Sequence, residues 1–152
     1  MCFYGKTMLT CFKHIDSINN QIENLIIKKA KGSFYGTTSA LDVANELIDL
    51  GEVRLDLMEL KEVTEIALSK LCAEDKILLE YKYFNLLPSL ENFDHTSRNY
   101  FRKQVRAIGR FNKALEGLGY DEKWFLDNYL KIPFIKGAYH KTIKEEGKKH
   151  VK

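Results

Sequence analysis

The sequence predicts an all-α fold, in which a long antiparallel N-terminal helical pair is followed by a C-terminal bundle of shorter helices. Only two prolines occur in the 152 residues, at positions 88 and 133. No segment alternates apolar and polar residues with the period of two that is typical of β-strands. Apolar residues instead recur at steps of three and four along most of the chain, which is the pattern of amphipathic helices.

The first helix is predicted from an apolar stripe that begins at Phe12 and continues for about twenty residues. The members of the stripe are Phe12, Ile15, Ile18, Ile22, Leu25 and Ile26. Lysines at positions 28, 29 and 31 crowd the last turn, where positive charge is favourable against the helix dipole. Gly32 follows them, and glycine is typical of the residue after a helix end.

A second long helix is predicted to begin at Ser39, which precedes Asp42 by three residues in the manner of a capping box. Its apolar stripe reaches about residue 72. The stripe consists of Leu41, Ala44, Leu47, Ile48, Val53, Leu57, Leu60, Val63, Ala67 and Leu71. Gly51 lies inside it, at a cost of about 1 kcal/mol relative to alanine. A short loop at residues 32–38 is expected to let the two helices pack as an antiparallel pair.

Shorter helices are predicted after this pair. One covers residues 71–84 and has Glu74 and Asp75 in its first turn, where carboxylates are favourable. A second, very short helix is expected to start near Ser89. Thr96 or Ser97 can cap the helix that follows, because a hydroxyl oxygen can accept from free backbone N–H groups.

That helix is expected to run to Leu118 and to end at Gly119, a typical C-terminal stop. Asp121 is expected to cap one further helix, and Pro133 is expected to end it. The lysine-rich residues 136–152 are predicted to form a flexible basic arm that adds non-specific affinity for nucleic acid.

The formal net charge of +3 conceals charged blocks. Residues 39–80 hold eleven acidic and four basic side chains, whereas residues 96–118 hold six basic and one acidic. An acidic middle beside a basic C-terminal third indicates one region for protein contacts and another for a polyanion. The alternative is that these charged runs are only solvated faces.

Several classes of protein are not indicated by the sequence. The longest apolar stretches run only three or four residues, so no membrane span is expected. Three cysteines without a C-x-x-C spacing are typical of reduced thiols in a cytoplasmic protein. The four histidines are scattered, so neither a metal site nor a cofactor is predicted. No nucleophile, base and stabiliser form a recognisable catalytic motif, so the protein is not expected to be an enzyme.

The most informative segment is residues 97–118. At about 100° per residue, one narrow stripe contains Phe101, Val105, Ile108, Asn112 and Leu115. A separate face contains Arg98, Arg102, Arg106, Arg110 and Lys113. The arginines repeat at i+4 and repel one another, and no acid is interleaved before Glu116. A phosphate backbone would offset that repulsion through counterion release, and arginine suits bidentate contacts with phosphate or guanine.

Two stretches carry a family resemblance. The first is Leu71-x-x-Glu-Asp-Lys-x-Leu-Leu-Glu-Tyr-Lys-Tyr-Phe84. The second is Ser97 followed by Arg98-Asn-Tyr-Phe-Arg-Lys-Gln-Val-Arg-Ala-Ile-Gly-Arg-Phe-Asn-Lys-Ala-Leu115. Together they resemble region 4 of the sigma-70 family of RNA polymerase factors, a helix-turn-helix that reads promoter DNA. The whole layout also resembles small phage and prophage regulators of Gram-positive bacteria, of the RinA and ArpU kind.

The resemblance implies a C-terminal helix-turn-helix-like bundle in a DNA-binding transcriptional regulator. In such proteins the first stretch is the supporting helix, and the serine opens a recognition helix that enters the major groove of double-stranded DNA. The residues implied to lie nearest the bases or adjacent phosphates are Ser97, Arg98, Asn99, Arg102 and Lys103. Those implied to follow the backbone are Arg106, Arg110 and Lys113.

The expected organisation has three parts. Residues 1–70 form a helical hairpin for dimerisation or for contact with RNA polymerase, and a homodimer is expected to form through residues 10–70. Residues 71–135 form the sigma region 4-like module with one extra helix, and residues 136–152 form the basic tail.

One departure from the family pattern leaves a second hypothesis open. The family's middle helix usually carries Glu-Ile-Ala and a glycine turn before the serine. Here only twelve residues separate Phe84 from Ser97, and that glycine is missing. The alternative function is therefore a helical protein–protein adaptor, or an anti-sigma-like factor, that no longer reads DNA and uses acidic residues 39–80 to bind a basic partner.

Overall fold

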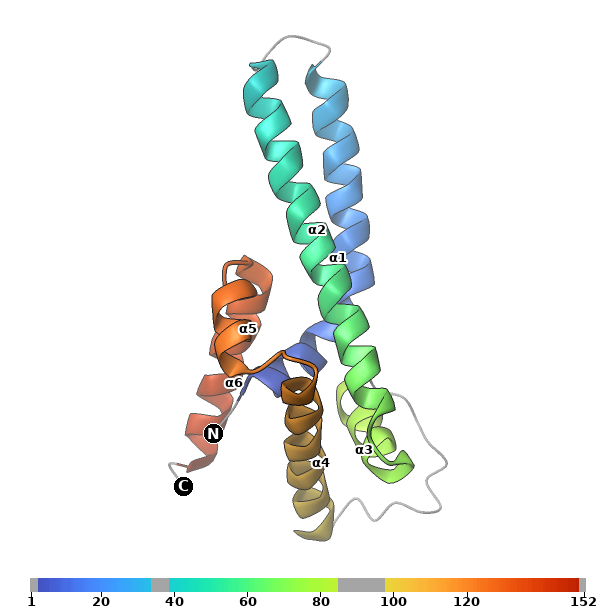
Figure 1. The fold of residues 1–152 in the computed structure, drawn as a ribbon. Coiled ribbons are helices and arrows are strands. Elements are labelled where there is room, and N and C mark those ends of the chain that lie inside the picture. The colour runs from blue at the N-terminus through green and yellow to red at the C-terminus, as the bar shows by residue number, and fades with distance from the viewer. Residues whose placement is uncertain (1–2, 34–38, 85–97, 151–152) are drawn as a thin grey trace. The chain divides into compact units, whose positions relative to one another are not determined.

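The computed structural model describes residues 3–33, 39–84 and 98–150 (Figure 1). Within these ranges the chain forms α-helices and no strand, which confirms the all-α prediction. The helices are α1 (Tyr4–Ser33), α2 (Ala40–Ser69), α3 (Ala73–Phe84), α4 (Arg98–Gly117), α5 (Glu122–Asn128) and α6 (Pro133–His150). None of these described helices has an apolar stretch long enough to cross a membrane.

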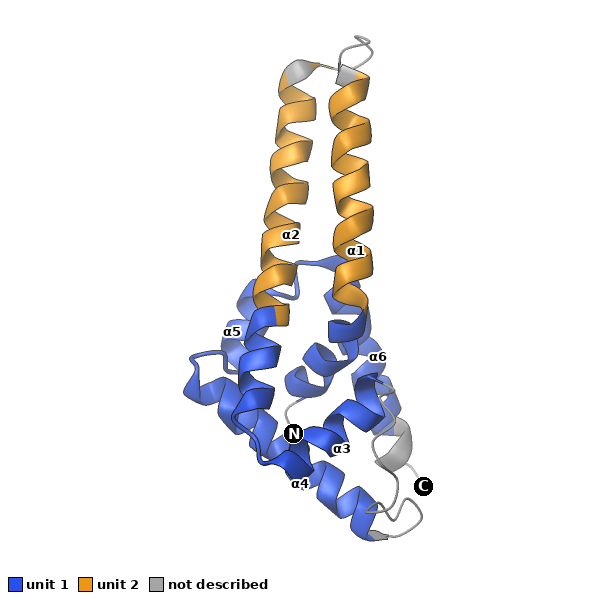
Figure 2. Cartoon of the chain, turned by 90° about the vertical axis from the view of Figure 1, so that its right-hand side faces the viewer, with its two compact units in different colours: residues 1–13, 62–152 blue, residues 14–61 orange. Residues whose placement is uncertain are grey.

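The chain divides into two compact units (Figure 2). Unit 1 comprises residues 1–13 and 62–152, and unit 2 comprises residues 14–61. The N-terminal residues thus group with the C-terminal helices, whereas the sequence analysis assigned them to the hairpin. The chain passes between the units within α1 and again within α2, so helix boundaries and unit boundaries do not coincide.

Unit 2 contains antiparallel segments of α1 and α2 (Figure 2). Three ion pairs join them, and they run in opposite order along the two helices: Lys29–Glu46, Arg54–Glu23 and Lys61–Asp16, at 2.6, 3.7 and 2.9 Å. Most of these side chains are substantially exposed, so each pair contributes at most about 1 kcal/mol. Gly51 lies in the middle of α2 and does not interrupt it.

The N-terminal turns of α1 belong to the core of unit 1. The sequence analysis placed the helix start near Phe12, but α1 begins at Tyr4. Tyr4, Met8 and Leu9 are fully or almost fully buried, and the Tyr4 ring lies 5.9 Å from that of Phe125. The Tyr4 hydroxyl donates to the backbone oxygen of Asn112 at 3.2 Å. The N-terminus of α1 therefore packs against α4 and α5.

Helix α6 corrects two expectations. Pro133 begins a helix here, which suits its fixed φ and its missing N–H, instead of ending one. The segment expected to be a flexible arm is helical as far as His150, and Ile135, Thr142 and Glu146 are buried. Glu146 forms an ion pair with Lys6 of α1. Spacings of seven and four residues place these three side chains on one side of the helix. The segment was expected to be an arm because of its many lysines, and this spacing was not considered.

The predicted C-terminal stop of α4 at Gly119 and the predicted N-terminal cap of α5 at Asp121 are both confirmed. Gly119 has a φ of 90°, and the N–H of Tyr120 donates to the Leu115 oxygen at 2.9 Å, as in a glycine-terminated helix. The Asp121 carboxylate caps α5 by accepting from the Trp124 N–H at 2.8 Å. Of the loop expected at residues 32–38, residues 32 and 33 belong to α1 and the rest lie outside the described residues. The short helix expected near Ser89 and the caps at residues 96 and 97 also lie outside them.

Candidate nucleic-acid interface

Helix α4 packs through a face that differs from the predicted one. Its buried residues are Gln104, Ala107, Ile108, Phe111 and Leu115. The centre of this set is rotated by roughly 60° from the predicted stripe, at about 100° per residue. Phe101 and Val105, which were expected to be buried, are 64% and 65% exposed. The prediction was wrong at these two residues because it ranked positions by hydrophobicity alone.

Gln104 shows why hydrophobicity was a poor guide. It is 3% exposed, and its Nε2 donates to the Tyr100 hydroxyl one turn earlier at 2.7 Å. That bond satisfies part of the amide, so a polar side chain can occupy the buried face without the full cost of desolvation. The Tyr100 ring also contacts Tyr81 of α3 edge-on, with centroids 6.5 Å apart. Burial and the neighbouring Tyr81 both raise the pKa of Tyr100.

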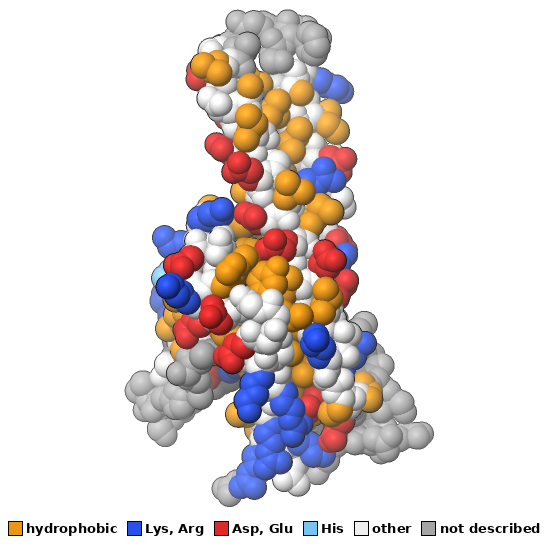
Figure 3. Space-filling model, viewed as in Figure 1, with side chains coloured by type: hydrophobic (Ala, Val, Ile, Leu, Met, Phe, Trp, Pro, Cys, Tyr) orange, Lys and Arg blue, Asp and Glu red, His pale blue; other side chains and the backbone are white. Residues whose placement is uncertain are grey.

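Three basic side chains form what we call the open cationic face of α4: Arg102, Arg106 and Lys113. All three are exposed, and among the described residues none of them forms an ion pair with a carboxylate. Figure 3 shows lysine and arginine side chains gathered over α4. Positive charge is therefore concentrated on one side of this helix.

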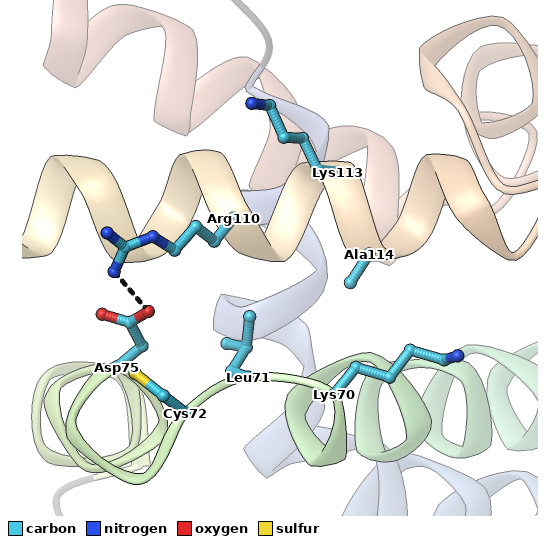
Figure 4. Close-up of a pocket in the computed structure, with 7 residues that line it drawn as sticks. All are labelled: Lys70, Leu71, Cys72, Asp75, Arg110, Lys113 and Ala114. Carbon is cyan, nitrogen blue, oxygen red and sulfur yellow. Dashed lines mark hydrogen bonds and ion pairs between the residues drawn. The ribbon is translucent and has the colours of Figure 1, made fainter.

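Two further basic residues of α4 that were singled out for DNA contact, Lys103 and Arg110, have carboxylate partners in α3. Arg110 donates from Nη1 to Oδ2 of Asp75 at 2.7 Å, and Lys103 Nζ lies 3.0 Å from Oε1 of Glu74 (Figure 4 shows the first pair). The Asp75 side chain is only 6% exposed, whereas that of Arg110 is 56% exposed. The hydrogen bond from the guanidinium to Asp75, and then the charge of that carboxylate, raise the pKa of Arg110. The Arg110–Asp75 pair therefore links α3 to α4 and neutralises a charge that the sequence alone leaves free.

The remaining predicted contact residues lie at the N-terminal end of α4. Asn99 is exposed in the first turn. Arg98 begins the helix, and only its backbone is described, whereas Ser97 lies outside the described residues. The structure thus brings Asn99, Arg102 and Arg106 onto one accessible helix.

An open depression of about 590 Å³ lies beside the Arg110–Asp75 pair (Figure 4). It is lined by Lys70, Leu71, Cys72, Asp75, Arg110, Lys113 and Ala114. Lys70 directly follows α2 and adds a third cation beside Arg110 and Lys113. Lys70 could not be predicted from a helical wheel of α4, because such a wheel contains no residue of another element.

Within the described part of the chain, no group of three or more His, Cys, Asp or Glu side chains could hold a metal ion. Comparison of the chain with protein-family models, with curated proteins and with solved structures finds no match.

Proposed function

We propose that this protein binds double-stranded DNA through the open cationic face of α4 and acts as a transcriptional regulator. The observation that carries the proposal is that Arg102, Arg106 and Lys113 share one exposed face without a carboxylate partner among the described residues. Two cations of the same helix do have such partners. Acids are thus available nearby, and they pair with Lys103 and Arg110 instead of with this face.

The dimensions of α4 suit the major groove. An α-helix with its side chains is about 10–12 Å across, and the groove is about 12 Å wide. Arg102 and Lys113 are eleven residues apart, so the open cationic face extends for about 16 Å along the helix at 1.5 Å per residue. A face of that length can neutralise several phosphates, and each one neutralised releases counterions.

The contact between α3 and α4 would fix the orientation of the DNA-binding helix. Arg110 and Asp75 join the two helices through a nearly buried carboxylate, and Tyr81 contacts Tyr100 nearby. A charge pair of this kind specifies geometry better than it adds stability. In this proposal Arg110 positions α4, while Arg102, Arg106 and Lys113 contact phosphates.

The exposed side chains of Phe101 and Val105 support recognition of bases in addition to phosphate contact. Both are largely exposed, and on a helical wheel they lie between the buried face and Arg102. Apolar side chains in the major groove recognise the methyl group of thymine. The same two residues also support the alternative, a protein–protein adaptor, because an exposed apolar pair can equally bind a protein such as RNA polymerase.

Binding of the full chain to a short mixed-sequence duplex, followed by fluorescence anisotropy, tests the proposal. Arg102→Ala combined with Arg106→Ala is expected to weaken binding at least tenfold, because a hydrogen bond to a charged group contributes about 1.5–3 kcal/mol. Lys28→Ala combined with Lys31→Ala removes the same charge from the exposed face of α1 and is expected to change affinity little. Equal affinity of the Arg102/Arg106 variant and the wild type would exclude this face as the DNA site. Binding of RNA polymerase by the protein, with no DNA binding by the wild type or any variant, would favour the adaptor.

A further inference from the structure

Helix α2 carries a row of apolar or small residues that we call the outer seam: Leu41, Ala44, Ile48, Gly51, Leu55 and Met58. All six belong to unit 2. The four large side chains are 69%, 58%, 67% and 50% exposed, in the order Leu41, Ile48, Leu55 and Met58. The spacing alternates between three and four residues, which is the a/d pattern of a coiled-coil seam. The residues that join α2 to α1, Glu46, Arg54 and Lys61, are not part of it.

The outer seam is complementary to itself when it is reversed. Its two ends are Leu41 and Met58, and counting inward from both ends opposes Ala44 to Leu55 and Ile48 to Gly51. An antiparallel pairing of two copies of α2 therefore places each small residue against a large one in the four inner layers, and Leu41 against Met58 in the two outer layers. A parallel pairing in register would place Gly51 against Gly51 and Ala44 against Ala44, and it would leave holes between them.

The surface around Gly51 has room for the opposing side chain. An open depression of about 560 Å³ is lined by Ile48, Gly51, Leu55 and Met58 of α2 and by Ile26 of α1, with the charged Glu52 and Arg54 of α2 at its border. A Cβ added at Gly51 would meet nothing within 4 Å beyond its own stretch of helix in the single chain. Ile48 of a second copy can therefore enter the depression at Gly51, as a knob enters a hole.

The area of the outer seam is sufficient for a weak dimer. Its four large side chains leave on the order of 400 Å² of apolar surface exposed on each chain, as much as the largest patch of a typical monomer. Two such patches with their borders bury about 1,000 Å² in total, the lower limit for a specific interface. From this area, the reversed size complementarity and the depression at Gly51, we infer that the protein forms a homodimer in which α2 packs antiparallel against α2 of a second copy.

Disulfide formation between variants that each carry one introduced cysteine tests the register. Two chains are made in a background of Cys2→Ser and Cys72→Ser, one carrying Ala44→Cys and the other Leu55→Cys. The remaining Cys11 is buried. The mixture is expected to yield a covalent dimer on mild oxidation, and each chain alone is not. Two copies of residue 44 would lie about 16 Å apart along the helix axis, beyond the reach of about 7 Å between disulfide-bonded Cα atoms. Covalent dimers from either chain alone, or none from the mixture, would overturn the antiparallel pairing.

Sedimentation velocity tests the dimer itself without any DNA. The wild type is expected to sediment as a concentration-dependent dimer. Ile48→Glu and Leu55→Glu are each expected to raise the dissociation constant at least tenfold, because each would bury a carboxylate in an apolar layer. Leu126→Glu is the matched control, since Leu126 is an exposed leucine of α5 outside the seam. Circular dichroism should show unchanged helix content in all three variants. A wild type that remains monomeric, or Glu variants that dimerise as it does, would overturn the inference.

Discussion

The guanidinium of Arg110 donates a hydrogen bond to the carboxylate of Asp75 at 2.7 Å, so a cation on the predicted DNA-binding face is held by the first turn of α3. The two side chains have very different environments, since Asp75 is nearly buried and Arg110 is more than half exposed. Because the buried Asp75 carboxylate needs this cation, we assign Arg110 a structural role in the α3–α4 contact and not a role in DNA contact.

Arg110→Ala is expected to lower the thermal midpoint more than Asp75→Ala does. The first substitution leaves the nearly buried Asp75 carboxylate without its cation, whereas the second leaves an arginine that water can solvate. Lys103→Ala is the control, because Glu74 is 60% exposed and regains water at little cost. Calorimetry of the three variants checks the order. Equal effects for Arg110→Ala and Lys103→Ala would contradict the assignment of Arg110 to the α3–α4 contact.

Gly5→Ala is expected to destabilise the protein by about 1–3 kcal/mol through overpacking. A Cβ at position 5 would overlap Oδ1 of Asn112 and lie 3.3 Å from Cδ1 of Phe111, so the Asn112 side chain would have to rotate away or α1 and α4 would have to repack. Gly137→Ala is the matched control, since a Cβ there meets nothing within 4 Å inside α6. It should be neutral or stabilising by up to about 1 kcal/mol. Urea unfolding measures both, and a harmless Gly5→Ala would contradict the close packing.

The free energy of unfolding is expected to fall as the pH rises above about 9. Burial raises the pKa of the Cys11 thiol from 9.0 to about 12. The unfolded chain therefore loses this proton at a lower pH than the folded chain, which destabilises the fold between these two values by up to about 1.4 kcal/mol per pH unit. Tyr83 acts in the same direction, because burial, and then the charges of Glu146 and Glu145, raise its pKa above 10.0. Urea unfolding at neutral and alkaline pH measures this loss, which Cys11→Ala should reduce; an identical pH dependence in that variant would refute the role of Cys11.

Phe101→Ala is expected to change sequence preference while leaving the salt dependence of DNA binding unaltered. The side chain is 64% exposed, so its removal should alter stability by no more than about 0.5 kcal/mol. Thymine-methyl contact is specific to bases, whereas the slope against salt counts neutralised phosphates. Selection from a randomised duplex pool compares the variant with the wild type. An unchanged selected consensus would remove Phe101 from base recognition.

Predictions from the sequence were successful where local chemistry decides the structure. Asp121 and Gly119 were identified from their types and positions, because capping and left-handed termination involve only neighbouring backbone groups. The Lys103 and Arg110 partners could not be found in this way. They depend on how α3 packs against α4, and Asp75 and Arg110 are 35 positions apart in the chain.

Other differences arise because packing, more than residue type, decides burial. Gln104 is buried beside Tyr100, whereas the more apolar Val105 is exposed. Lys6 of α1 pairs with Glu146 at the other end of the chain, so a lysine-rich segment that looked like a solvated arm packs as a helix. No window of sequence contains both Lys6 and Glu146. The Tyr100 partner of Gln104 is only four residues away, but which face of α4 is buried depends on the helices that pack against it.

The most direct test of the central claim is the salt dependence of duplex binding by the wild type and by the Arg102→Ala/Arg106→Ala variant. The logarithm of the binding constant should fall linearly with the logarithm of salt concentration, with a slope of about −0.9 for each phosphate neutralised. The slope of the variant is expected to be shallower by about 2, because two phosphate contacts are lost. The Lys28→Ala/Lys31→Ala variant should keep the wild-type slope. Equal slopes for the Arg102/Arg106 variant and the wild type would contradict the claim that α4 binds DNA through its open cationic face.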